Sequence, residues 1–411
     1  MIANVPPPVT LAQHYRRFLA ALAAEGFEGE ISQRHADRTV LATDNSIYQR
    51  LPQAVVFPKH AEDVVRLARL MDRDEHRRVA LAPRGGGTGT NGQSLTDGIA
   101  VDLSRHLNGI RWIDPVRRVA RVQAGVIKDQ LNAALAPHGL FFAPELSTSN
   151  RATIGGMVGT DASGQGSCAY GKTRDHVLAL EVVLPGGERF ESRPAGPDEL
   201  QAQLARPGRV GDAWRCAHRI AERDAALIEQ RFPKLNRCLT GYDLAHLRER
   251  DGRFNLNSVL CGSEGSLGFI VEAELHLLPI PRHTVLVNVR YAGFMDALRD
   301  AQALMAHAPL SIETVDSRVL MLAMEDIVWQ DVAEYFPSSE DRAPTRGINM
   351  VEFSDDSLEL LETRVATFVA HLARDAGAAR LGHTIAAGHA AVTRVYAMRK
   401  RAVGLLGNVD G

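Results

Sequence analysis

The chain has 411 residues, of which 45% are hydrophobic and 23% are charged, and its formal net charge at pH 7 is −2. This length predicts two or three domains with a sizeable buried core. The small net charge gives no reason to expect nucleic acid or an anionic membrane as a partner. The N-terminus lacks the basic and apolar regions of a secretory signal, and no apolar run approaches the length of a membrane span.

The cysteines are too far apart in the sequence to form a C-x-x-C pair or a disulfide framework. They are Cys168, Cys216, Cys238 and Cys261. An iron–sulfur cluster therefore cannot be built from this chain alone, and a reducing cytoplasm is the expected location.

The first part of the chain alternates helical and strand patterns. Residues 11–26 predict an amphipathic helix that ends at a glycine, and residues 54–57 predict a short buried strand. A second amphipathic helix is expected over residues 60–74, followed by a strand over residues 78–85. Because strand, helix and strand follow one another, this region is expected to have an α/β arrangement.

The next patterns continue the alternation. Residues 98–104 predict a strand, and residues 110–125 predict a hairpin that turns at Asp114 and Pro115. Residues 126–139 predict a helix that a terminal glycine closes.

A glycine-rich loop, residues 82–94, separates two of these predicted strands and contains a formal G-x-G-x-x-G. A Rossmann fingerprint would need a long helix that starts inside the loop, but only a few residues precede the next strand. We therefore interpret the loop as a strand–loop–strand crossing whose glycine amides face an anionic ligand. A merely flexible turn is the alternative.

Residues 166–173 match the Walker A pattern G-x-x-x-x-G-K-[ST] letter for letter. A working P-loop follows a buried strand and opens a helix whose N-terminus faces the phosphates. Here a polar, turn-rich tract precedes the match and a strand pattern, residues 175–187, follows it. No helix is expected to start at Lys172, so a P-loop ATPase is only a distant alternative.

Three glycine-rich segments, residues 83–92, 144–177 and 260–275, together resemble one known family. They are similar to the vanillyl-alcohol oxidase / p-cresol methylhydroxylase-type FAD-binding oxidoreductases, and in particular to the N-terminal part of the long bacterial D-2-hydroxyglutarate dehydrogenase-type proteins, which are related to D-lactate and glycolate dehydrogenases. The similarity runs from residues 43–64 to residues 394–408, and it is more specific than either short pattern.

The resemblance implies an α+β fold, with a two-subdomain p-cresol methylhydroxylase (PCMH)-type FAD-binding domain followed by a ferredoxin-like α+β cap domain. We expect an N-terminal helical lead over residues 1–45, the FAD-binding domain over residues 46–281 and the cap or substrate domain over residues 282–411.

The resemblance also implies which residues hold FAD. The first loop would wrap the pyrophosphate with backbone amides, and Ser94 would close the loop. The second segment would pass the flavin ring and the ribityl chain, and the third would line the adenine. The implied residues are Arg84, Gly85, Gly86, Gly87, Thr88, Gly89, Asn91, Ser94, Glu145, Leu146, Ser147, Thr153, Gly155, Gly156, Thr160, Ala162, Ser163, Gly164, Tyr170, Gly171, Gly265, Ile270 and Val271.

Some members of the family tether FAD to a histidine in the first glycine loop. This loop has no histidine, so non-covalent FAD is expected. The nearest downstream histidine, His106, is interpreted as a surface residue at a strand end. Glu272 and Glu274 are expected to be exposed or paired carboxylates, whereas the role of Glu264 is left open.

The C-terminal region alternates strands and amphipathic helices. Strands are expected over residues 284–291, 310–317 and 347–356, and helices over residues 294–308 and 358–377. Strands with helices packed on one face predict a ferredoxin-like sheet.

Arg399 resembles the arginine of a family motif that grips the substrate carboxylate. The planar guanidinium suits this task because it can make two parallel hydrogen bonds to a carboxylate. The alternative is a solvated basic helix face that also carries Arg394, Lys400 and Arg401.

In the related D-2-hydroxy-acid dehydrogenases a divalent metal and a proton-accepting histidine follow this arginine motif, and the longest relatives add an iron–sulfur region. No match to these groups is found before Gly411, so no metal is assigned to this chain, which is expected to be the catalytically incomplete front part of a larger protein. Such a chain should bind FAD weakly and reduce it slowly.

The sequence thus favours an FAD-dependent dehydrogenase of a small D-2-hydroxy acid. The first candidate for the substrate is D-2-hydroxyglutarate, and the second is D-lactate. Hydride would pass to the flavin, and the electron acceptor is unassigned. The alternative from another class is a non-catalytic FAD-binding fragment of a truncated dehydrogenase.

Overall fold

The computed structural model describes residues 10–235, 241–337, 344–374 and 379–405. The chain divides into two compact units. The larger unit contains the residues up to 164 together with residues 171–279, and the smaller unit contains residues 165–170 and 280–411. This division falls two residues before the boundary expected from the sequence. Cys238 lies outside the described residues.

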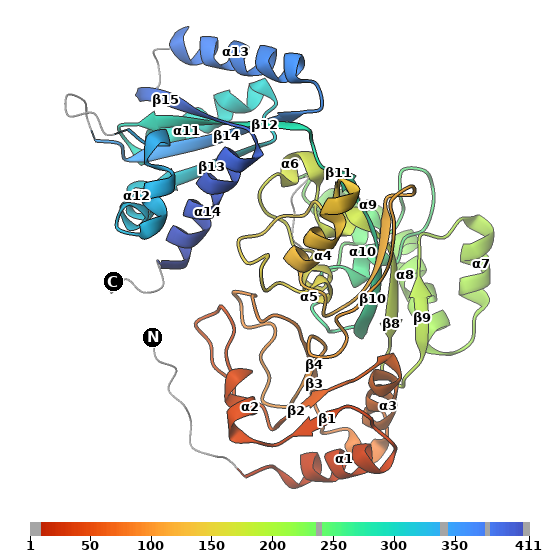
Figure 1. The fold of residues 1–411 in the computed structure, drawn as a ribbon. Coiled ribbons are helices and arrows are strands. Elements are labelled where there is room, and N and C mark those ends of the chain that lie inside the picture. The colour runs from red at the N-terminus through yellow and green to blue at the C-terminus, as the bar shows by residue number, and fades with distance from the viewer. Residues whose placement is uncertain (1–9, 236–240, 338–343, 375–378, 406–411) are drawn as a thin grey trace. The chain divides into compact units, whose positions relative to one another are not determined.

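The larger unit begins with a small sheet whose strands follow the order β1-β2-β4-β3 (Figure 1). β4 pairs in parallel with β2 and β3, whereas β1 is antiparallel to β2. The helices α1 and α3 bury an apolar face against this sheet, with Phe18 and Leu67 in the shared core. The elements are α1 (Gln13–Ala24), β1 (Glu30–Ser32), α2 (His35–Val40), β2 (Ala54–Phe57), α3 (Ala61–Met71), β3 (Leu81–Arg84) and β4 (Ile99–Asp102).

The second subdomain of this unit is an antiparallel sheet with the order β5-β6-β10-β8-β9. The expected hairpin is confirmed, and Gly139 ends the following helical segment with a left-handed φ of 67°. The elements are β5 (Ile110–Asp114), β6 (Val119–Gln123), α4 (Lys128–Leu135), β7 (Leu140–Phe141), α5 (Ile154–Gly159), β8 (Val177–Val183), β9 (Arg189–Ser192), α7 (Pro197–Ala205), α8 (Gly208–Arg223), α9 (Ala225–Arg231), α10 (Asn257–Leu260), β10 (Phe269–His276) and β11 (Leu278–Pro279).

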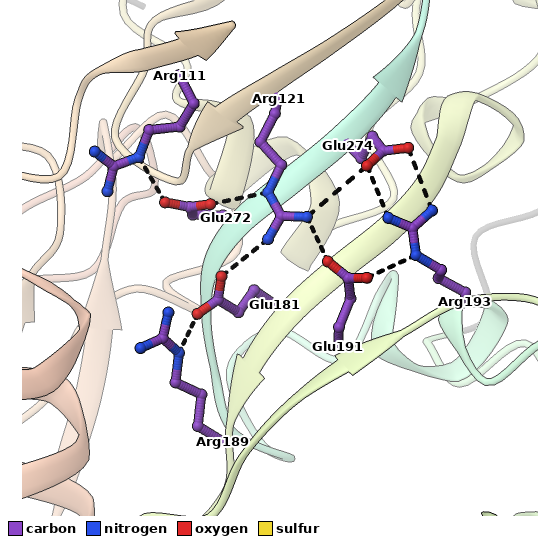
Figure 2. A network of polar contacts seen from close by, with 8 residues as sticks. All are labelled: Arg111, Arg121, Glu181, Arg189, Glu191, Arg193, Glu272 and Glu274. Atoms are coloured by element: carbon purple, nitrogen blue, oxygen red, sulfur yellow. Dashed lines mark hydrogen bonds and ion pairs between the residues drawn. The ribbon is translucent and has the colours of Figure 1, made fainter.

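One face of the five-stranded sheet carries a charged ladder of arginines and glutamates (Figure 2). Arg121 on β6 lies at its centre and donates to Glu181 and Glu272 at 2.9 Å each and also to Glu191. Alternation along the strands places like-facing side chains beside one another, so that opposite charges meet across strands. The ladder consists of Arg111, Arg121, Glu181, Arg189, Glu191, Arg193, Glu272 and Glu274.

Two strand carboxylates, Glu272 and Glu274, were expected to be exposed or paired, and both belong to this ladder. Burial would lower the pKa of Arg121, but its hydrogen bonds to Glu191 and Glu272 raise that pKa above the usual value. The guanidinium is therefore charged at every accessible pH.

The smaller unit is built on an antiparallel sheet with the order β13-β14-β12-β15. With a helix between β12 and β13 and another between β14 and β15, this is the expected ferredoxin-like arrangement. The elements are α6 (Ser167–Tyr170), β12 (His283–Tyr291), α11 (Phe294–Leu304), β13 (Ser311–Asp316), α12 (Ser317–Met324), β14 (Gly347–Asp355), α13 (Leu358–Arg374), β15 (Arg380–Ala387) and α14 (His389–Leu405).

The expectation that helices cover only one face of this sheet is wrong. Val287 and Val289 pack on the side of α11 and α13, whereas Leu286 packs on the side of α12 and α14 (Figure 1). The apolar run of β12 is thus buried on both faces, which explains why it does not alternate cleanly with polar residues. The strand β15 and the helix α12 were not anticipated from the sequence.

Candidate cofactor site

A pocket of about 520 Å³ lies in the larger unit. Three stretches of chain form most of its wall, namely the loop between β3 and β4, the segment around α5, and the loop before β10, and shorter segments complete it. Most of the residues implied by the family resemblance line it, namely Arg84, Gly85, Gly86, Gly87, Thr88, Gly89, Asn91, Ser94, Leu146, Thr153, Gly155, Gly156, Thr160, Ala162, Ser163, Gly265 and Ile270. The three glycine-rich segments, although far apart in the sequence, therefore meet at one place.

The first glycine loop connects two parallel neighbouring strands without a helix between them. This confirms the strand–loop–strand interpretation and excludes the Rossmann one. The buried Arg84 side chain holds the loop together: it donates to the Ser94 hydroxyl at 3.2 Å and to the Thr43 carbonyl at 2.8 Å. The Ser94 hydroxyl in turn donates to Asp44 at 3.1 Å, so Ser94 links Arg84, at the start of the loop, to Asp44 outside it.

The glycines of this loop are required by the loop itself. A Cβ atom at Gly86 would lie 2.0 Å from the Arg151 carbonyl oxygen, and one at Gly85 would lie 2.3 Å from the Thr153 hydroxyl. Gly87 has a φ of 61°, in the left-handed region. The backbone therefore packs closely against the segment that precedes α5, and it leaves its amide groups along the pocket.

Gly159, the last residue of α5, differs from these glycines. It lines the pocket, and a Cβ atom built there meets nothing within 4 Å. The space in front of Gly159 is therefore open to a ligand.

The Walker-like lysine does not occupy a phosphate-binding loop. Lys172 is almost fully buried and its ammonium group lies 2.5 Å from an Asp161 carboxylate oxygen. A helix does start directly after it, contrary to expectation, but this is the short 3-10 helix η3 (Thr173–His176), which runs into strand β8. The match lacks the geometry of a P-loop because Lys172 is paired with Asp161 and the helix that follows it, η3, has only 4 residues.

Six of the implied cofactor residues do not line the pocket: Glu145, Ser147, Gly164, Tyr170, Gly171 and Val271. Val271 is fully buried in the core of the first subdomain. Glu145 forms an ion pair with Lys128, and Gly164 packs against the Glu145 backbone, where a Cβ atom would meet the carbonyl oxygen at 2.1 Å. Tyr170 belongs to the smaller unit. Close backbone packing and strand alternation, which family motifs do not express, account for these differences.

Sequence reasoning missed several residues of the pocket wall. They are Pro83, Thr90, Gln93, Leu103, Ala124, Thr148, Ala152, Met157, Gly159, Asp161, Lys172, Gly241, Asp243, Gly262, Glu264 and Gly268. Thr90 and Gln93 lie inside the glycine loop and could have been included from their position. Asp161 has a φ of 46°, and no sequence pattern predicts this strained backbone conformation.

The histidine singled out near the loop, His106, is hydrogen-bonded to Glu30 at 2.7 Å and lies beyond the end of β4. This fits the interpretation as a surface residue at a strand end. Among the residues that the structure describes, no group of three or more His, Cys, Asp and Glu side chains is arranged to hold a metal.

Arg399 lies on α14 in the smaller unit and its guanidinium contacts the Glu313 carboxylate on β13. Its side chain is 24% exposed, compared with 47% for Arg394 and 57% for Arg401 on the same helix. The lower exposure of its side chain thus distinguishes Arg399 from the more solvated arginines on the same helix. Composition alone did not make this distinction.

Models of known families match both units. Residues 52–193 match the FAD binding domain, and residues 280–411 match the C-terminal domain of FAD linked oxidases. With the two sheets, the loop geometry and the pocket, these matches show an FAD binding domain followed by the C-terminal domain of FAD linked oxidases, and the cofactor of such a chain is FAD.

Named relatives refine this assignment. The chain is 67% identical to the D-2-hydroxyglutarate dehydrogenase of Pseudomonas putida and 47% identical to that of Escherichia coli, in each case over 100% of this chain and 41% of the relative. It is also 30% identical to the glycolate oxidase subunit GlcD of Bacillus subtilis, over 68% of this chain and 48% of the relative. The chain therefore spans about two fifths of the length of the two dehydrogenases.

Solved structures support the fold. An alkyldihydroxyacetonephosphate synthase superimposes with a TM-score of 0.66 at 18% identity, over 93% of this chain and 63% of that chain. At this identity the likeness concerns architecture and not chemistry.

Proposed function

We propose that the protein is an FAD-dependent dehydrogenase that oxidises a small D-2-hydroxy acid, with D-2-hydroxyglutarate as the first substrate and D-lactate as the second. The observation that carries the proposal is the 67% identity to the Pseudomonas putida enzyme over the whole of this chain. Such identity does not favour the alternative of a non-catalytic FAD-binding remnant. The D-lactate dehydrogenase of Anaerostipes hadrus is a more distant relative, at 25% identity over 66% of this chain.

The pocket fits the cofactor in chemical terms. A dinucleotide pyrophosphate carries about two negative charges, and glycine-rich backbone offers unhindered N–H donors to such a group. The loop from Gly85 to Gly89 supplies this backbone, and the wall near Gly156, Gly159 and Thr160 supplies further space. When bound, FAD provides the hydride acceptor of the reaction.

Binding is proposed to be non-covalent. The loop contains no histidine, and the described residues that line the pocket include neither histidine nor cysteine. Flavin should therefore leave the protein on denaturation and remain in the filtrate after precipitation with acid.

Arg399 is the proposed ligand of the substrate carboxylate. A guanidinium group has five N–H donors, and one carboxylate uses at most two of them, so the contact with Glu313 leaves donors for a second carboxylate. Its partial exposure allows a small anion to reach it. Arg399→Lys should weaken binding of the hydroxy acid because an ammonium group lacks the planar fork.

The decisive experiment is anaerobic reduction of bound flavin, which is measured as the loss of its visible absorbance. The 411-residue chain and the product of the complete open reading frame that encodes it are loaded with FAD and mixed with D-2-hydroxyglutarate, D-lactate or L-2-hydroxyglutarate. We expect D-2-hydroxyglutarate to reduce the flavin fastest in the complete product and the L-enantiomer to have no effect.

Two outcomes would contradict the proposal. Equal reduction by both enantiomers would argue against a D-2-hydroxy-acid site, and retention of FAD without reduction by any acid in either protein would revive the non-catalytic alternative. A comparison of the two proteins also measures how much of the activity the 411 residues carry.

A cytoplasmic location belongs to the same proposal. Cys168, Cys216 and Cys261 are free thiols, as is usual in a reducing compartment. No helix in the described part of the chain is long and apolar enough to cross a membrane. The electron acceptor is unassigned, and the absence of nucleic acid as a partner stays a prediction.

A further inference from the structure

The helix α14 faces the sheet of the smaller unit with two polar side chains one turn apart, Tyr396 and Arg399. The Tyr396 hydroxyl donates to Glu352 at 2.9 Å and lies 3.3 Å from the Ser311 hydroxyl. Arg399 contacts Glu313. Residues three apart on a helix share a face, and Ser311 and Glu313 share a face of β13 because they are two apart.

These contacts form two rungs between α14 and β13. The first rung is buried: the Tyr396 side chain is 8% exposed, and burial beside Glu352 raises the pKa of its hydroxyl, which therefore stays protonated. The second rung is partly open, with Arg399 24% and Glu313 18% exposed. The buried rung sets the position of the helix along the strand, and Arg399 then lies opposite Glu313.

We propose that Glu313 is the positioning residue of the substrate site: its carboxylate holds the Arg399 guanidinium in the orientation that receives the carboxylate of the hydroxy acid. The inference rests on the proposed function of Arg399. No sequence motif points to Glu313, which is joined to Arg399 only by the fold.

The physical reason is pre-organisation. A free arginine side chain has many rotamers, and a planar fork that is already fixed loses less conformational freedom for each hydrogen bond it forms. A carboxylate partner also compensates the half-buried positive charge while no substrate is present. An amide can accept the same hydrogen bond, so glutamine should preserve the orientation although it removes the charge.

The test compares Glu313→Ala with Glu313→Gln in the FAD-loaded product of the complete open reading frame. Flavin reduction is measured against D-2-hydroxyglutarate concentration. For Glu313→Ala we expect KM to rise roughly tenfold, equivalent to about 1.4 kcal/mol, with kcat within about twofold of the parent. For Glu313→Gln we expect KM within about threefold of the parent. Glu334→Ala, which removes the exposed partner of Arg394 on the same helix, should change neither value.

An unchanged KM in Glu313→Ala, an equal rise in both Glu313 variants, or a loss of kcat alone would overturn the inference. If Glu313→Ala does not fold, Glu313→Asp replaces it; its shorter carboxylate should raise KM to an intermediate value, and an unchanged KM would again overturn the proposal. Arg399→Ala distinguishes the substrate role of Arg399 from the positioning role of Glu313. If KM is unchanged in Arg399→Ala, the substrate role of Arg399 itself fails, whereas a rise there without one in Glu313→Ala rejects only the positioning role.

Discussion

The proposed FAD pocket and the charged ladder belong to the same unit, but different parts of the chain build them. The pocket wall is largely backbone: its glycines keep Cβ atoms away from Arg151, Thr153 and the ligand space. The ladder is almost entirely side chain, with ion pairs that join five strands (Figure 2). A backbone site leaves a dense local pattern in the sequence, whereas a side-chain network leaves only scattered charges that acquire meaning once the strands are paired.

The first prediction concerns the centre of the ladder and has the largest expected effect on stability. Arg121→Ala should lower the free energy of unfolding by about 2–3 kcal/mol, because it removes the cation that Glu181 and Glu274 share. Each of these buried carboxylates then keeps one partner, Arg189 for Glu181 and Arg193 for Glu274. Urea unfolding measures the loss. FAD affinity should stay the same if ladder and pocket are independent.

Arg111→Ala is the matched control. Arg111 pairs with Glu272 at the edge of the ladder and is 47% exposed, so its removal should cost less than about 1 kcal/mol. Equal losses in the two variants would show that the ladder has no energetic centre.

The second prediction concerns the pocket. Gly159→Leu should weaken FAD binding by about 100-fold, since a side chain placed in the open space would compete with the ligand at a cost of about 2–3 kcal/mol. Gly159→Ala should weaken binding by less. Equilibrium titration with FAD measures both. Unchanged affinity in Gly159→Leu would mean that FAD does not occupy this part of the pocket.

Two further variants serve as comparisons. Gly404 on α14 likewise has nothing within 4 Å of a Cβ atom, so Gly404→Leu should leave FAD affinity unchanged. Gly86→Val should also lose FAD, but by another route: its Cβ atom would meet the Arg151 carbonyl at 2.0 Å, so the loop itself must be distorted. A fall in thermal stability together with FAD loss should therefore mark Gly86→Val and not Gly159→Leu.

Sequence reasoning found the pocket because glycine spacing and strand order are local. It identified the loop from Arg84 to Ser94 and rejected the Rossmann pattern for the right structural reason, the lack of a long helix. It also rejected the Walker match, but it expected no helix after Lys172, whereas the short helix η3 starts there. It placed Val271 at the site, where alternation along β10 buries it instead. It discussed Lys172 only in the Walker-like match and did not place it at the pocket wall, because the proximity of Lys172 to Asp161 depends on a turn that only the folded chain defines.

The cap domain shows the same limit. The helices α11 and α13 were expected from their amphipathic patterns. The second covering layer of α12 and α14 was not expected, because the apolar run of β12 was not recognised as a sign of burial on both faces. Arg399 was found through a motif, whereas its partner Glu313 lies 86 positions away in the sequence and could not be chosen from the other carboxylates.

The third prediction concerns acid. Burial would raise the pKa of Glu191, but hydrogen bonds from Arg121 and Arg193 lower it below its ordinary value. A carboxyl with a lowered pKa in the folded state contributes stability above its unfolded pKa of about 4.3, and this contribution is lost as pH falls through the folded value. Glu191→Gln should therefore be slightly less stable than the parent at pH 7 and equally stable in strong acid.

The measurement is urea unfolding at several pH values. Because Glu191 is 37% exposed, solvent screening keeps the expected difference below about 1 kcal/mol. A difference that grows as the pH falls would reverse the sign and would show that the ladder does not favour the charged form of Glu191.

The smallest effect on ligand binding is expected at the Walker-like lysine, Lys172, which forms an ion pair with Asp161 in the pocket wall. Lys172→Ala would be a poor test because it leaves the buried Asp161 carboxylate without its cation. Lys172→Gln keeps a hydrogen-bond donor for that carboxylate, and we expect less than about a threefold change in FAD affinity and no change in the affinity for ATP. Calorimetric titration with each nucleotide gives both values. If ATP binds to the parent protein and this variant loses that binding, Lys172 must contact phosphate, and the ion pair with Asp161 would then have to open when the nucleotide enters.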